Sequence, residues 1–177
     1  MPSLRQQPHQ RMRGKYGKAG FEIRGVSQMS EKTQNFSLVF LRAALGIIFF
    51  AHGSQKLLGW YGGYGFDATV QFFQQMGIPP ALGTLAILAE FFGGLMVLLG
   101  FFTRIGAAGI AATMAVALFT VHLPQGFFIA GDKIGFEYVF ALLLMALYLV
   151  INGGGELSVD RYIREKTGSN VIGKLLS

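Results

Sequence analysis

Four apolar segments, each close to twenty residues long, alternate with polar or aromatic connections along this chain. They cover about residues 36–58, 81–102, 105–123 and 134–151. A helix needs about 20 apolar residues to cross the hydrocarbon core of a bilayer. The pattern therefore predicts an all-α membrane protein, a four-transmembrane-helix bundle in which the fourth span is the shortest.

The connections between these segments predict short interfacial helices. Residues 68–76 lie between Asp67, a candidate N-cap, and Gly77, a candidate C-terminal glycine. A second short helix is expected in LSVDRYIREK, which begins at Leu157. The aromatic residues that begin at Trp60 are typical of the membrane–water interface, so we place this connection at the outer surface.

Composition agrees with a membrane protein and narrows its chemistry. Charged residues make up 14% of the chain and hydrophobic residues 52%, whereas soluble domains have about 25% charged residues. The chain has no cysteine, which excludes disulfides, thiol nucleophiles, cysteine-ligated zinc and iron–sulfur clusters on its own residues. Any redox role therefore needs a bound cofactor, a quinone or a partner protein.

The basic residues predict the orientation of the chain. The formal net charge is +6, but the excess lies mainly in the two tails, so we expect no nucleic-acid partner. One side of the spans holds both tails and Arg104, whereas the other holds Lys56 and Lys133. Because cytoplasmic segments carry an excess of Lys and Arg, both termini are expected to be cytoplasmic, which requires an even number of spans.

The same features divide the chain into three parts. Residues 1–35 form a basic N-terminal tail that is expected to be disordered, and residues 1–28 of it read as an upstream extension because Met29 opens a more usual start. Residues 36–163 form the membrane domain. Residues 164–177 form a C-terminal cytoplasmic tail.

Ionisable residues within spans are rare and usually face protein or a water-filled cavity. This chain has six at or within the apolar limits, namely Arg42, His52, Lys56, Glu90, His122 and Glu137. Glu90 is the most informative, because a short carboxylate so far from both ends of its span cannot reach the headgroups. Gly83 and Gly94 share its helical face, which indicates close packing against another helix. We therefore expect Glu90 to point into the bundle and to pair with His52 or Lys56.

Four of these residues are expected at depths in the outer part of the bilayer, namely His52, Lys56, His122 and Glu137. We expect them to form one polar cluster with Glu90. This cluster is a candidate proton or quinone site. Two histidines on facing helices could also ligate haem, but such sites need matched depth and room for the macrocycle, so a quinone pocket is favoured and no metal site is predicted.

The arginines are expected to have a different role. Arg42 lies near the inner end of the first span, where it can extend to the cytoplasmic headgroups or take part in an ion pair within the bundle. Arg104 lies between the second and third spans, on the side that is expected to be cytoplasmic. Both are structural candidates rather than members of the outer cluster.

The motifs resemble those of a known family. They are LRAALGIIFFAHGSQKLLG, AEFFGGLMVLLGFFTRIGA, the His122-Leu-Pro turn, Gly135-Phe-Glu137 and GGGELSVDRYI. In this order they resemble the DoxX family over about residues 36–163. The resemblance implies a multi-pass protein of the bacterial inner membrane, linked to redox chemistry, with relatives that include a subunit of an archaeal thiosulfate:quinone oxidoreductase and a mycobacterial complex that handles oxidative stress. Seven residues match the polar positions of the family: Arg42, His52, Lys56, Glu90, Arg104, His122 and Glu137.

Three functions remain open from the sequence. The first is a redox-associated subunit, not a self-sufficient enzyme, in which Glu90 and His52 carry protons and an oxidoreductase partner supplies electrons. The second is a membrane scaffold whose polar residues fix the helix register, and whose basic tails bind anionic lipid or a cytosolic partner. The third is a small transporter, for which four spans would need to form a homo-oligomer.

Overall fold

The computed structural model describes residues 13–167. The chain divides into two compact units, residues 1–37 and 38–177, and each is described by itself. In the first unit, the described residues form the N-terminal part of helix α1, which runs over Arg13–Leu58. Residues 1–12 of the predicted N-terminal tail, and residues 168–177 of the predicted C-terminal tail, lie outside the described residues. Disorder of the tail and the three-part division stay predictions.

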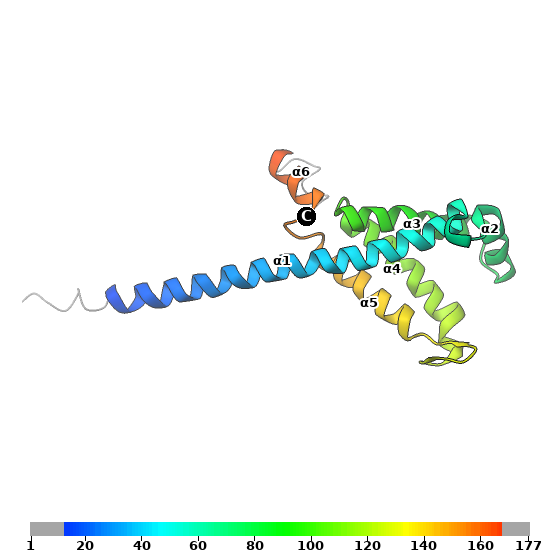
Figure 1. Cartoon of the computed structure of the whole chain (residues 1–177), viewed down its shortest axis with the longest axis horizontal. Helices are drawn as coiled ribbons and strands as arrows, with labels where there is room; N and C mark the ends of the chain where they lie inside the picture. The colour runs from blue at the N-terminus through cyan, green and yellow to red at the C-terminus, as the bar shows by residue number, and fades with distance from the viewer. Residues whose placement is uncertain (1–12, 168–177) are drawn as a thin grey trace, which may run out of the picture. The chain divides into compact units, whose positions relative to one another are not determined.

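In the second unit, the described residues are mainly helical. After α1 the elements are η1 (Trp60–Gly62), α2 (Gly65–Gln75), α3 (Pro80–Leu99), α4 (Thr103–Ala117), η2 (Leu118–His122), η3 (Leu123–Gln125), β1 (Ile129–Ala130), β2 (Lys133–Ile134), α5 (Glu137–Asn152) and α6 (Val159–Thr167). Helix α4 packs against both α3 and α5, and Figure 1 shows the three side by side.

Three stretches of described helix are long and apolar enough to cross a membrane. They are Asn35–Leu58, Pro80–Leu99 and Thr103–Gln125, and they correspond to the first three predicted segments. The fourth segment is an apolar helix, α5, but it has only 16 residues. The structure therefore confirms a mainly helical chain with three candidate membrane spans.

The start of the fourth predicted segment is wrong. Ile134 does not open a helix but pairs with Ile129 in an antiparallel hairpin, and α5 begins at Glu137. The hairpin turns at Gly131, whose φ of 58° lies in the left-handed region that glycine adopts without strain. The sequence I-A-G-D-K-I contains this turn signal, but its two isoleucines also resemble part of a span.

Two helix ends also differ from prediction. Helix α2 begins at Gly65, so Asp67 lies in its first turn instead of capping it. Gly77 follows this helix with a φ of 79°, as expected of a terminal glycine. Helix α3 ends at Leu99, three residues before the predicted end, because the chain turns into the left-handed conformation at Gly100.

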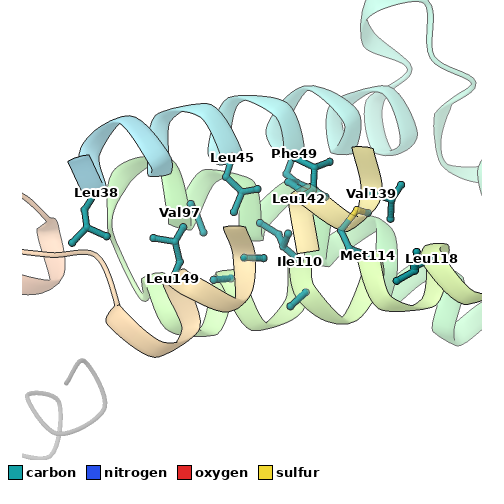
Figure 2. Packing of buried hydrophobic residues seen from close by; sticks show 13 residues of the cluster. Leu38, Leu45, Phe49, Val97, Ile110, Met114, Leu118, Val139, Leu142 and Leu149 are labelled. Atoms are coloured by element: carbon teal, nitrogen blue, oxygen red, sulfur yellow. The ribbon is translucent and has the colours of Figure 1, made fainter. Parts of the chain in front are cut away.

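The core of the second unit lies between α1, α3, α4 and α5. Its buried hydrophobic side chains, drawn in Figure 2, are Leu38, Leu45, Phe49, Val97, Ala107, Ile110, Ala111, Met114, Leu118, Val139, Leu142, Ala146 and Leu149. Burial of this set by four helices means that α5 belongs to the bundle, although it is shorter than the other three.

Glycines bring α1 and α3 into backbone contact. A Cβ added at Gly53 would lie 2.5 Å from Cα of Phe91, and one added at Gly94 would lie 3.0 Å from Cα of Phe50. Such distances are too short for real side chains, so glycine is required where the two helices meet. Small residues allow this close approach of helices in membranes, and the contact fixes the register of α1 on α3.

Candidate functional site

A buried ion pair joins α1 to α3. The ammonium Nζ of Lys56 lies 2.6 Å from both Oε1 and Oε2 of Glu90. The Glu90 side chain is 5% exposed and that of Lys56 is 29% exposed. Of the two partners that the sequence proposed for Glu90, the structure gives Lys56. The carboxylate is therefore enclosed, whereas the ammonium keeps an open side.

The register of α1 on α3 explains why these two residues meet. Gly53 packs directly on the backbone at Glu90 and Phe91, and Lys56 follows three residues later on the same helix. Residues three and four apart lie on one face of a helix, so the lysine side chain reaches along this face to the carboxylate. The ion pair thus depends on a glycine that brings the two backbones together.

Helix α2 lies against the lysine. The Phe73 ring centroid is 6.0 Å from Nζ of Lys56, within the range of a cation–π interaction. The buried hydroxyl of Thr69 donates to the carbonyl of Gly65 at 2.6 Å and lies 3.5 Å from the carbonyl of Lys56. A Cβ added at Gly83 would lie 3.0 Å from the Phe73 ring, so this glycine provides space for the ring.

His52 is exposed and does not contact Glu90 in the structure. Its Nδ1 lies 2.9 Å from the carbonyl oxygen of Ile48, one turn earlier in α1. A carbonyl only accepts hydrogen bonds, so Nδ1 must carry the proton. In the neutral imidazole, Nε2 then keeps a lone pair and acts as an acceptor.

His122 and Glu137 contact the hairpin instead of the Lys56–Glu90 pair. Nδ1 of His122 donates to the carbonyl of Ile134 at 2.7 Å, and Oε1 of Glu137 accepts from the backbone N–H of Ile129 at 2.9 Å. The side chains that the sequence assigned to one cluster therefore lie in separate groups. The contacts of His122 and Glu137 fix the loop between α4 and α5.

Arg42 is buried and binds backbone carbonyls of other segments. Its Nη1 donates to the carbonyls of Gly154 at 2.6 Å and Leu157 at 2.9 Å. Its Nε donates to the carbonyl of Val97 at 3.3 Å. The arginine thus joins α1 to the end of α3 and to the segment that follows α5.

Arg104 lies at the same end of the bundle. A Cβ added at Gly153 would come within 3.2 Å of its Nε. This Nε is buried and has no hydrogen-bond partner among the described residues. The side chain packs against the backbone that follows α5, which agrees with a structural role.

Sequence reasoning missed Asp160, which is buried. Its carboxylate accepts from the backbone N–H groups of Phe102 at 2.6 Å and Thr103 at 3.0 Å, and from the Thr103 hydroxyl at 2.8 Å. It thereby caps the N-terminus of α4, which has no cap from its own N-terminal side chains. Asp160 lies in the motif GGGELSVDRYI. Nothing in that motif indicates that its partner is Thr103, 57 positions earlier in the chain.

The arrangement can bind a polar group but does not form a metal site. Among the residues whose side chains the structure describes, no group of three or more His, Asp or Glu is placed to hold a metal ion. The Lys56 ammonium has three N–H bonds, and the Glu90 carboxylate takes at most two of them, so at least one remains as a donor. The site can therefore donate a hydrogen bond to a ligand oxygen within an apolar bundle.

Comparison with known proteins agrees with the sequence motifs. The family model described as DoxX matches residues 37–123. The chain is 33% identical to "Putative oxidoreductase CatD" of Bacillus subtilis (strain 168), over 79% of this chain and 97% of that protein. It is 30% identical to "Inner membrane protein YqjF" of Escherichia coli (strain K12), over 77% of this chain and 98% of that protein.

A third relative is "Inner membrane protein YphA" of Escherichia coli (strain K12), which is 31% identical over 70% of this chain and 88% of its own length. No solved structure matches the chain. The family match and the near-complete coverage of these relatives agree with each other. The chain belongs to the DoxX family.

Proposed function

We propose that this chain is a four-span protein of the inner membrane, with both termini in the cytoplasm, that serves as a quinone-binding subunit of a redox system. The observation that carries the proposal is the Lys56–Glu90 ion pair, whose carboxylate is buried and whose ammonium has an open side. The names of the relatives support a redox role in the inner membrane, because one is called "Putative oxidoreductase CatD" and two are called inner membrane proteins.

The contacts at the two ends of α5 support a fourth crossing. Its start lies next to the end of the third candidate span, since the backbone N–H of Glu137 donates to the carbonyl of Phe127. Its end lies next to the start of that span, since a Cβ added at Gly154, two residues after α5, would lie 2.6 Å from the Thr103 hydroxyl oxygen. Helix α5 therefore runs between the two ends of a candidate span.

The length of α5 agrees with this path. Its 16 residues extend about 24 Å at the helical rise of 1.5 Å per residue, somewhat less than the hydrocarbon thickness of about 30 Å. Short helices are tolerated when the bilayer thins locally or flanking residues complete the crossing. The basic residues outside the spans favour cytoplasmic termini.

Labelling of single cysteines will test the crossing, because the natural chain has no cysteine. Asp132→Cys lies in the turn of the hairpin before α5, and Lys166→Cys lies in α6 after it. We expect a membrane-impermeant maleimide to label Asp132→Cys in intact cells, and Lys166→Cys only after the inner membrane is permeabilised. Labelling of both positions from the same side would contradict four spans.

Lys56 provides the chemistry that a quinone headgroup requires. A quinone carbonyl accepts hydrogen bonds, and the third N–H of the ammonium is available to donate one. The apolar helices around the pair suit an isoprenoid tail, and Phe73 provides a flat apolar surface next to Nζ. Reduction of a quinone takes two electrons and two protons, and these are proposed to come from an oxidoreductase partner and from water, respectively.

The tryptophan of this chain is a built-in probe for the proposed ligand. Trp60 is the single tryptophan, and it lies four residues after Lys56 with half of its surface exposed. We expect a short-chain benzoquinone to quench its fluorescence saturably in detergent. The neutral double variant Lys56→Met/Glu90→Met should weaken binding at least about tenfold, which corresponds to about 1.4 kcal/mol.

A matched control is Lys133→Met, which removes an exposed lysine from β2. This variant should bind the quinone as the natural protein does. Quenching that does not saturate, or a folded double variant with unchanged affinity, would overturn the proposal. The second result would favour a scaffold in which the ion pair only fixes α1 on α3.

A further inference from the structure

Two hydrogen-bonding groups of α1, the ammonium of Lys56 and Nε2 of His52, indicate which redox form of the ligand the site prefers. We infer that the site binds a hydroquinone more tightly than the corresponding quinone, with His52 as the residue that distinguishes them. The inference rests on the proposed function and goes further, because it assigns a hydrogen-bond acceptor as well as a donor.

The donor is the ammonium of Lys56. Both carboxylate oxygens of Glu90 lie 2.6 Å from Nζ, so the carboxylate takes at most two of the three N–H bonds. The remaining N–H can donate to a ligand, and the lysine has no lone pair with which to accept. Glu90 is 5% exposed and already engaged on both oxygens, which leaves it little capacity for a ligand hydroxyl.

The acceptor is Nε2 of His52. Because Nδ1 donates to the carbonyl of Ile48, the neutral ring presents an unprotonated Nε2 on an exposed side chain. His52 and Lys56 are four residues apart in α1, so they lie one turn apart on the same face. This face of α1 thus offers a ligand one hydrogen-bond donor and one acceptor.

The two redox forms of the ligand differ in how they meet these groups. The carbonyl oxygens of a quinone only accept, so a quinone can bind Lys56 but has nothing to donate to His52. Each hydroxyl of a hydroquinone both donates and accepts, so one can accept from Lys56 while the other donates to His52 Nε2. A hydrogen bond contributes about 0.5–1.5 kcal/mol, which predicts a preference for the hydroquinone of up to about tenfold.

Calorimetric titration of the purified protein, with a short-chain benzoquinone and with its hydroquinone under argon, tests the inference. The natural protein should bind the hydroquinone several-fold more tightly. His52→Phe should abolish the preference and retain binding of the quinone, since the histidine is exposed and its loss leaves the ion pair intact. His52→Gln, whose amide oxygen restores an acceptor, should regain part of the preference.

The control is His122→Phe, which removes the histidine that contacts the hairpin and should leave the ratio of the two affinities unchanged. Equal affinities in the natural protein, or an unchanged ratio in His52→Phe, would overturn this inference and leave the quinone site standing. Binding of neither form to the natural protein would overturn the proposed function as well.

Discussion

Replacement of Lys56 with methionine will lower the free energy of unfolding by about 3 kcal/mol, because it leaves the Glu90 carboxylate buried without a cation. Removal of one partner from a buried ion pair costs about 3–5 kcal/mol. The lower value applies here because the lysine side chain is 29% exposed. Denaturant titration in detergent, followed by far-ultraviolet circular dichroism, will measure the change.

The double variant Lys56→Met/Glu90→Met tests whether the loss of stability comes from the unpaired charge of Glu90. Replacing both members of a buried pair by apolar residues of similar volume is often neutral or stabilising, so this variant should recover most of the lost stability. If Lys56→Met were as stable as the natural protein, or if the double variant were the less stable of the two, the account of a buried pair would be wrong.

Replacement of Arg42 with methionine will lower the free energy of unfolding by a similar amount. It removes charge-assisted hydrogen bonds to the carbonyls of Gly154 and Leu157 and leaves these carbonyls without that partner. Hydrogen bonds to charged groups contribute about 1.5–3 kcal/mol each, so we expect a loss of about 3 kcal/mol. Thermal unfolding in detergent will report it, together with faster proteolysis of the segment after α5.

A matched control for this arginine is Arg161→Met. Arg161 pairs with Glu156 at 3.1 Å and with Glu165 at 2.8 Å, and these side chains are 35%, 48% and 60% exposed, respectively. Exposed ion pairs contribute about 0–1 kcal/mol, so the control should unfold near the natural temperature. Equal effects of the two replacements would contradict the structural role of Arg42.

The sequence predicted the first three spans and the need of Glu90 for a partner, for physical reasons that are local. A run of apolar residues determines a span, and a short carboxylate inside it cannot reach water. The choice between His52 and Lys56 was beyond the sequence, because it depends on the register of α1 against α3. That register follows from backbone contact at Gly53 and Gly94.

Long-range caps were not predictable in this way. Asp160 caps Thr103 across 57 positions of sequence, whereas the usual capping signal lies at the start of the helix itself. Arg42 binds carbonyls 112 and 115 positions away, and nothing near it in the sequence identifies them. The same limit applies to His122 and Glu137, whose contacts depend on a hairpin of which the sequence predicts only Ile134 to belong to a span.

The central claim is that a quinone binds beside the Lys56–Glu90 pair, and photolabelling of the natural protein tests it most directly. A short-chain azidoquinone would be photolysed in the detergent-solubilised protein, and the labelled peptides would be mapped by mass spectrometry. The account predicts saturable labelling near His52, Lys56 and Phe73, which excess unlabelled quinone prevents. Labelling confined to the hairpin near His122 and Glu137, or labelling that excess quinone does not reduce, would contradict it.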